Sequence, residues 1–244
     1  MKKRYIVPGL ILALSLTLLS FVNPGISKSA PVTDSLVSYE APATASKSML
    51  SSLYESLDLS GFGLSKEAFD YAVKGYQKLV DNGEVEKNKY LTVIDFSQSS
   101  RKKRFYLIDV ENQELVVNTF VSHGKNSGVD MAKSFSDRIN SNQSSLGFYV
   151  TKGTYTGKHG LSLRLSGKER GFNANAEPRA IVVHGADYVN AGRVNSGFMG
   201  RSQGCPALPM KDYAKVINLI KDGSVMFIYH PSQNYIQQSQ LING

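Results

Sequence analysis

The sequence predicts a mostly β domain, built as two packed sheets or a partly closed barrel with a few peripheral helices. From Tyr90 onward, short runs rich in β-branched and aromatic residues alternate with turn residues, as expected for strands. Clear helical periodicity is confined to two stretches, 65–81 and 211–222. The chain has 244 residues, 41% of them hydrophobic, which suits one ordinary globular domain plus an appendage.

Residues 1–29 have the pattern of a secretory signal peptide. A basic start at 2–4 precedes an apolar core at 7–22, and cleavage after Ser27 or Ser29 would follow small residues. The alternative is a retained membrane anchor, although a span needs about twenty apolar residues and this core is shorter. We therefore expect export to the periplasm or cell wall, with no stable membrane span after signal cleavage.

Two segments are expected before the strands. Residues 30–57 are rich in Ser, Ala and Pro and are predicted to be a flexible leader, in which a short helix starts near Met49. Residues 58–89 are predicted to be a helical segment that packs on the core, with Ser65 as N-cap and Gly83 as the stop. Its apolar face consists of Phe69, Ala72, Val73, Tyr76, Leu79 and Val80.

Residues 90–232 are predicted to be the β-rich domain. Its strands are expected at 90–96, 104–110, 115–121, 147–152, 161–165, 179–184 and 225–229. The second and third strands would form a hairpin, the fourth and fifth are separated by a turn-like stretch at 153–160, and the last would close the sheet. The final residues, 233–244, are expected to be a polar tail.

The net charge of +8 falls when the predicted signal peptide is removed, leaving 24 basic against 20 acidic residues. A mild excess of this kind suits a polyanionic partner but is common among proteins. The basic run 101–104 lies at a turn and is typical of a solvated loop. Nucleic acid is not expected as a partner, because no basic helix with interleaved aromatic residues occurs.

Cys205 is the only cysteine, so an exported chain has no internal disulfide to form. It is either a buried inert thiol or a thiol kept for chemistry. Its neighbours Gly204 and Pro206 place it on no apolar periodic face, which favours the reactive thiol.

His184 follows the chain's most β-like run and would leave the sheet at a strand end. A Gly-rich segment then leads to Cys205, 21 positions later, and its glycines allow sharp turns that bring the two side chains together. A thiol beside an imidazole is the arrangement of a nucleophile with its general base. The alternative is a histidine that only caps the strand.

Five ordered segments carry a family resemblance. They are V-S-H-G-K-N-S-G (121–128), S-N-Q-S-S-L-G-F-Y (141–149), Y-T-G-K-H-G-L-S-L-R-L (155–165), R-A-I-V-V-H-G-A (179–186) and G-R-S-Q-G-C-P-A-L-P (200–209). Over about 91–229 the chain resembles the murein L,D-transpeptidases. The resemblance implies a β-sandwich and an enzyme that acts on peptidoglycan tetrapeptide stems. Such an enzyme forms a thioester on cysteine, releases D-Ala and passes the acyl group to a neighbouring stem.

The resemblance also assigns the carbonyl of Gly185 to fix the second ring nitrogen of His184. The chemistry needs N–H donors for an oxyanion, for which Gly204, Cys205 and Gln203 are the natural backbone candidates. Many family members have a histidine at the position of Gln203, and an Arg or Asn after the cysteine, where this chain has Pro206.

Further residues are candidates for binding the substrate. Arg201 is expected to supply the missing positive charge for a substrate carboxylate, unless it forms only a surface ion pair. Ser202 is expected to bond within the cysteine loop, and the alternative is a plain turn residue. His159 and His123 lie in matching segments and are expected to line the cleft, His159 with the stronger case.

Other functions remain open at this stage. With water as acceptor the enzyme would be an L,D-carboxypeptidase, and without activity the chain would be a cell-wall-binding module. A zinc peptidase using His123, His159 and His184 lacks the usual ligand spacing. We expect neither a metal nor another cofactor, and the sequence does not indicate an oligomeric state.

Overall fold

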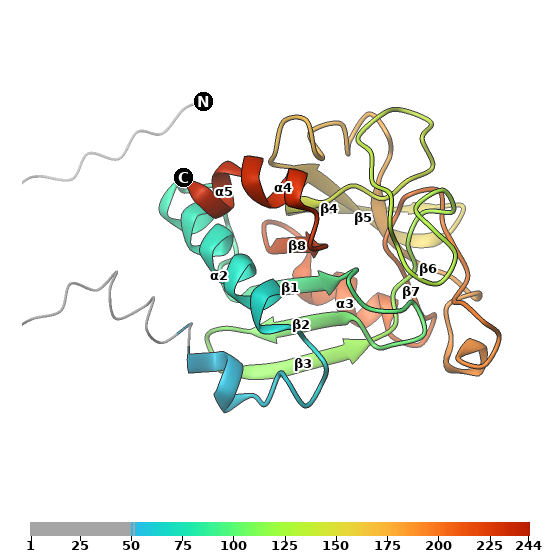
Figure 1. Cartoon of the computed structure of the whole chain (residues 1–244), viewed down its shortest axis with the longest axis horizontal. Coiled ribbons are helices and arrows are strands. Elements are labelled where there is room, and N and C mark those ends of the chain that lie inside the picture. Colours follow the sequence, from blue (N-terminus) through green and yellow to red (C-terminus); the bar gives the residue numbers. More distant parts are fainter. Residues whose placement is uncertain (1–49, 51) are drawn as a thin grey trace, which may run out of the picture. The chain divides into compact units, whose positions relative to one another are not determined.

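The computed structural model describes residues 50 and 52–244 (Figure 1). The predicted signal peptide and most of the predicted leader lie outside the described residues. At the centre is one eight-stranded sheet in the order β3-β2-β1-β8-β4-β5-β6-β7. The predicted mostly β fold with few helices is confirmed. Of the two expected arrangements, the sheet adopts that of a nearly closed barrel.

The strands are β1 (Tyr90–Asp95), β2 (Phe105–Asp109), β3 (Glu114–Thr119), β4 (Gly147–Gly157), β5 (Gly160–Gly167), β6 (Val182–Gly185), β7 (Ala207–Leu208) and β8 (Val225–Tyr229). The helices are α2 (Lys66–Asp81), α3 (Tyr213–Ile220), α4 (Gln233–Gln238) and α5 (Gln240–Asn243), with a short 3-10 helix η1 (Ala191–Arg193). No helix within the described residues is long and apolar enough to cross a membrane.

The two edges of the sheet meet beside the cysteine. After β3 the chain runs along β7 and the cysteine loop before it, and the N–H of Ser122 donates to the carbonyl of Ala207 in β7 at 2.9 Å. The N–H of Ser202 donates to the carbonyl of His123 at 3.0 Å, and Gly124 and Ser202 form an isolated parallel bridge. These contacts join the edge strands and leave few backbone groups open to another chain.

Strand β8 lies in the middle of the sheet, so the prediction that it closes the sheet is wrong. It pairs with β1 in parallel and with β4 in antiparallel direction. The physical reason is its composition, Val-Met-Phe-Ile-Tyr, with all five residues buried. A strand that is apolar on both faces requires cover on both faces, which a central position provides.

The β4–β5 hairpin is longer than expected. Both strands continue into the stretch predicted as a turn, and only Lys158 and His159 connect them. A register shift between Thr151 and Thr154 marks a β-bulge, which bends a strand and re-aims its end. Strand β6 begins later than predicted, at Val182, because Ala180 has a positive φ of 52° that a strand does not accommodate.

Helix α2 forms as predicted, with the Ser65 side chain accepting the N–H of Ala68 at 3.2 Å. Its apolar face is buried, except that Val80 is only half-buried. Residues 52–56, inside the predicted leader, are also helical, and two of their side chains are buried, Leu53 and Tyr54.

The last twelve residues, predicted as a polar tail, contain α4 and α5. Their few apolar side chains face inward, with Tyr235 fully buried and Ile242 nearly so. The hydroxyl of Tyr235 donates to buried Glu169 at 2.9 Å, which fixes this end of the chain to the segment that follows β5. The mostly polar composition of 233–244 concealed this packing.

Candidate active site

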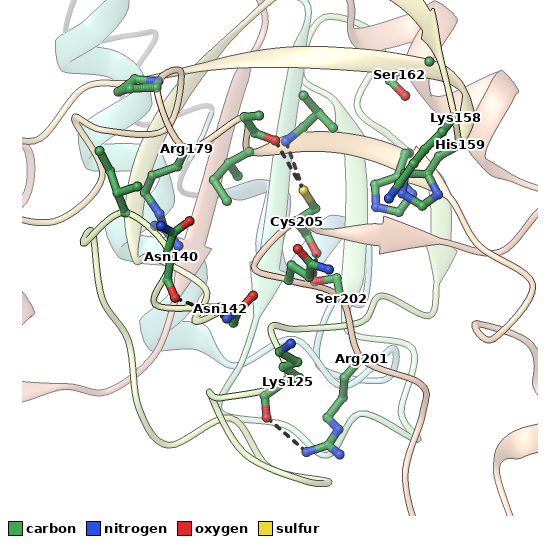
Figure 2. A pocket seen from close by; sticks show the side chains of 18 of the residues that line it. Lys125, Asn140, Asn142, Lys158, His159, Ser162, Arg179, Arg201, Ser202 and Cys205 are labelled. Atoms are coloured by element: carbon green, nitrogen blue, oxygen red, sulfur yellow. Dashed lines mark hydrogen bonds between the residues drawn. The ribbon is translucent and has the colours of Figure 1, made fainter.

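A cavity of about 610 Å³ opens between the end of the β4–β5 hairpin, the long loop before β4 and the cysteine loop (Figure 2). The long loop, which follows β3, is cross-braced: Ser144 accepts the N–H of Gly124, and its own N–H donates to Ser127. The cavity is lined by Lys125, Ile139, Asn140, Asn142, Tyr155, Gly157, Lys158, His159, Ser162, 178–182, His184, Tyr188, 201–203 and Cys205. Six of the nine predicted site residues lie on this lining: Cys205, His184, Arg201, Ser202, Gln203 and His159.

Cys205 is half-buried at the floor of this cavity. Its sulfur accepts the N–H of Val182 at 3.4 Å and lies 3.6 Å from the carbonyl oxygen of Ala180, to which the S–H donates. The preceding Gly204 has a φ of 125°, and a Cβ there would lie 2.8 Å from the carbonyl oxygen of Gln143. Only glycine fits at this position, and the tight fit fixes the path of the chain at the cysteine.

The thiol is protonated at neutral pH. Burial raises the pKa of Cys205, and the N–H of Val182 and the positive charge of Arg179 offset this only in part. Since a thiol attacks a carbonyl only as the thiolate, a base must remove its proton.

His184 is the last residue but one of β6, with its ring in the cavity lining and only 3% of its surface exposed. Its Nδ1 lies 2.9 Å from the carbonyl oxygen of Gly185. A carbonyl only accepts, so Nδ1 carries the hydrogen and Nε2 is the free, basic nitrogen of the neutral ring. Burial lowers the pKa of His184, opposed by the bond to Gly185, so the ring is neutral at pH 7 and able to accept a proton.

Gly185 also has a packing role. A Cβ on this residue would lie 2.7 Å from the sulfur of Met210 and 2.8 Å from the ring of Tyr213. The absence of a side chain therefore lets the start of α3 approach the strand end that carries His184.

The structure brings the thiol and the imidazole to one cavity but does not join them. In register, His184 lies opposite Ala207, two residues after Cys205. Throughout the described residues, the hydrogen bonds of the sulfur go to Val182 and Ala180. Catalytic hydrogen bonds often form only when the substrate is bound.

One of the predicted oxyanion donors is already occupied. The N–H of Gly204 donates to the Ser202 hydroxyl at 3.0 Å, and this hydroxyl donates to the carbonyl of Cys205 at 2.6 Å. Ser202 therefore braces the loop, as expected of a residue that bonds within it. The N–H of Gly204 is therefore engaged within the loop in this structure, and its role as an oxyanion donor stays a prediction. The N–H of Cys205 lies beside its own sulfur.

Arg201 lies on the side of the cavity formed by the long loop. Its Nη1 donates to the carbonyl oxygens of Lys125 at 3.0 Å and Gly128 at 3.1 Å. Figure 2 shows Arg201 and Lys125 to one side of Cys205, and Lys158 and His159 to another. No acidic side chain of the described residues lines the cavity, so its lining is basic.

His123 is fully buried and does not line the cavity, so its predicted place in the cleft is wrong. The Nη2 of Arg104 donates to His123 Nδ1 at 2.7 Å, and His123 Nε2 donates to the carbonyl of Gly128 at 3.2 Å. The histidine braces the loop from behind. In the part of the chain that the structure describes, no group of three His, Cys, Asp or Glu side chains could hold a metal ion.

Sequence reasoning missed Arg179, which contributes to the cavity wall beside the cysteine. Its Nη2 donates to the carbonyl of Gln143 at 2.6 Å, its Nη1 to the carbonyl of Ser136 at 2.8 Å, and it lies 3.8 Å from Asp137. An arginine at the start of the apolar strand predicted at 179–184 was the available signal. Also missed were Lys125, Asn140, Asn142, Tyr155, Lys158 and Tyr188.

Residues 62–229 match the family model described as the L,D-transpeptidase catalytic domain, which is more than half of the chain. The chain belongs to this family. The expected resemblance is confirmed, and the matched L,D-transpeptidase domain contains every residue of the cavity lining.

Among solved structures, the L,D-transpeptidase domain is similar to an L,D-transpeptidase from Mycobacterium smegmatis, with 14% identity, 58% of this chain and 59% of that chain covered, and a TM-score of 0.37. L,D-transpeptidase 3 from Mycobacterium tuberculosis matches with 12% identity, coverages of 58% and 61%, and a TM-score of 0.36. Pgp2, a helical cell shape determining protein from Campylobacter jejuni, matches with 12% identity, coverages of 67% and 57%, and a TM-score of 0.38. The chain spans less than two thirds of the length of each of these proteins. No curated protein matches.

Replacing Gly185 with alanine is expected to lower the free energy of unfolding by about 1–3 kcal/mol, since the added methyl group forces Met210 and Tyr213 to move. Chemical denaturation measures the change. The matched control is Gly153→Ala, whose Cβ would meet no atom closer than 3.9 Å, and it is expected to stay within about 0.5 kcal/mol. Equal effects of the two substitutions would contradict the packing role of Gly185.

Proposed function

We propose that the protein is a cysteine L,D-transpeptidase that acts on the tetrapeptide stems of peptidoglycan. The observation that carries this proposal is the shared cavity of Cys205 and His184, in which the Gly185 carbonyl holds the imidazole in the tautomer of a base. Family membership supports the reaction class.

The proposed reaction has two halves. His184 Nε2 takes the proton of the thiol, and the sulfur attacks the carbonyl of the third residue of the stem. Collapse of the tetrahedral intermediate breaks the amide bond to D-Ala, whose amine leaves with the proton from His184. An amine of a second stem then attacks the thioester, forms the new amide and returns the proton to the sulfur through His184.

The charge of the cavity suits this substrate. Lys125, Lys158, Arg179 and Arg201 line it, and the described lining holds no carboxylate to oppose them. Stem peptides carry carboxylates, and basic walls around a partly enclosed space raise the local concentration of such anions. The N–H of Cys205, beside its own sulfur, is suitably placed to donate to the oxyanion.

Cys205→Ser is expected to abolish turnover of purified tetrapeptide muropeptides, because an alcohol replaces the thiol. His184→Ala removes the base, so the thiol stays protonated and turnover falls to nearly the same level. Because the two groups act as one unit, the double variant should lose little more than either single one. Product masses give the readout: a cross-linked dimer identifies transpeptidation, and a tripeptide identifies hydrolysis by water. Turnover by the Cys205→Ser protein would contradict the assignment.

We propose that Arg201 binds a substrate carboxylate with the N–H groups not used on the long loop. Arg201→Ala should then weaken transition-state binding by about 1–3 kcal/mol, or roughly 5- to 150-fold in kcat/KM. Lys215→Ala on α3 is the control, since it removes the same charge from an exposed residue outside the cavity lining. An unchanged kcat/KM for Arg201→Ala, or an equal loss in both variants, would refute the role.

We also propose that the enzyme works outside the cytoplasmic membrane, as the pattern of residues 1–29 predicts. N-terminal sequencing of protein recovered from the cell envelope is expected to begin at Lys28 or Ala30. A sequence beginning at Met1 would be inconsistent with cleavage.

A further inference from the structure

The ring of His159 stacks on the ring of His184. The ring centroids are 4.4 Å apart and the planes are inclined by 22°. His159 belongs to the two-residue turn of the β4–β5 hairpin and is exposed, whereas His184 belongs to β6 and is almost completely buried. Ser162 pairs with His184 across the sheet, so the end of the hairpin returns over the histidine of the neighbouring strand.

The stack restrains a motion that the bond to Gly185 leaves free. That bond fixes the position of Nδ1, but the ring plane is still able to turn about it. His159 is the only aromatic ring that contacts His184 among the described residues. It covers one face of the imidazole and thereby fixes the direction in which Nε2 points.

The charges around His184 oppose its protonation. Lys158 and His159 face it from the hairpin turn, and Lys125, Arg179 and Arg201 line the same cavity. The remaining titratable groups nearby are the Cys205 thiol, the Tyr155 and Tyr188 phenols on the lining and the Tyr213 phenol packed at Gly185. No carboxylate of the described residues lines the cavity to balance these cations.

We propose that His159 is a positioning residue for the base, which holds the His184 ring by stacking and sets, through its own charge, the pH at which that ring becomes protonated. The inference rests on the proposed function, in which His184 is the base. A neutral His159 offers its π face to the imidazolium that forms when the thiol is deprotonated. A protonated His159 repels that imidazolium and keeps His184 basic at a lower pH.

The groups that shift the pKa of His184 determine how this pKa changes when the charge of His159 is lost. Burial lowers the pKa of His184 most, and the charges of His159 and Lys158 lower it further against the raising effect of Gly185. Removing the charge of His159 while keeping an aromatic ring should therefore raise the pKa of His184. The acidic limb of kcat/KM should move to higher pH in the same variant.

The test uses NMR titration of the four histidine rings in the full chain, with the signals of His159 and His184 assigned from variants that lack each one. His159→Phe keeps an aromatic ring on His184 but removes the charge, and it is expected to raise the titration midpoint of His184. His159→Ala removes the ring as well, and its kcat/KM at the plateau is expected to fall about 2- to 13-fold, the factor that corresponds to losing an aromatic pair. Lys158→Gln tests the effect of charge alone. It is expected to raise the titration midpoint of His184 while the ring of His159 stays stacked on it.

A midpoint of His184 that is the same in wild type and His159→Phe would overturn the inference, whether or not the enzyme turns over. So would a His159→Ala variant with unchanged kcat/KM at the plateau. Failure of the proposed function gives a different result, because a wild-type protein inactive on tetrapeptide would contradict the function while a raised midpoint in His159→Phe still supports the contact between the rings.

Discussion

The site depends on the pairing of the segment after β3 with the cysteine loop. The bonds from Ser122 to Ala207 and from Ser202 to His123 join the edges of the sheet. Behind them, the fully buried Arg104 donates to the carbonyls of Val121 and Gln98 and to the ring of His123. A buried guanidinium is tolerated only when its N–H groups have acceptors. The N–H groups of Arg104 therefore have acceptors only while the segment after β3 keeps this conformation. The same conformation positions the cysteine loop, which pairs with that segment.

Cys205 and His184 are both neutral in the free protein. Burial raises the pKa of the Cys205 thiol and lowers the pKa of the His184 imidazole, so each environment disfavours an ion pair in the free protein. The sulfur bonds instead to the backbone of β6 and the residues before it. The thiolate would form only when a substrate carbonyl is present to receive it, which limits reactions of the thiol with other electrophiles.

Local patterns predicted much of the fold and part of the site. The Ser65 cap, the β2–β3 hairpin and the strand-end His184 follow from signals within a few residues. Three His-Gly pairs occur, at His123, His159 and His184. The sequence does not reveal that His123 alone is turned away from the cavity, because its partner Arg104 is brought beside it only by the tertiary fold. The stacking of His159 on His184 was likewise not predictable, because the hairpin strands continue through residues that look like a turn, to Gly157 and from Gly160. In the last twelve residues, a polar composition hid the buried Tyr235.

The central claim is that Cys205 is the nucleophile of this L,D-transpeptidase domain. The most direct test is the intact mass of the protein after mixing with a carbapenem, which family resemblance implies as an acylating agent, followed by peptide mapping of the adduct. The account predicts one adduct on wild type, located on the peptide that contains Cys205, and none on the Cys205→Ser protein. An adduct on any other residue, or an equal adduct on the Cys205→Ser protein, would contradict it.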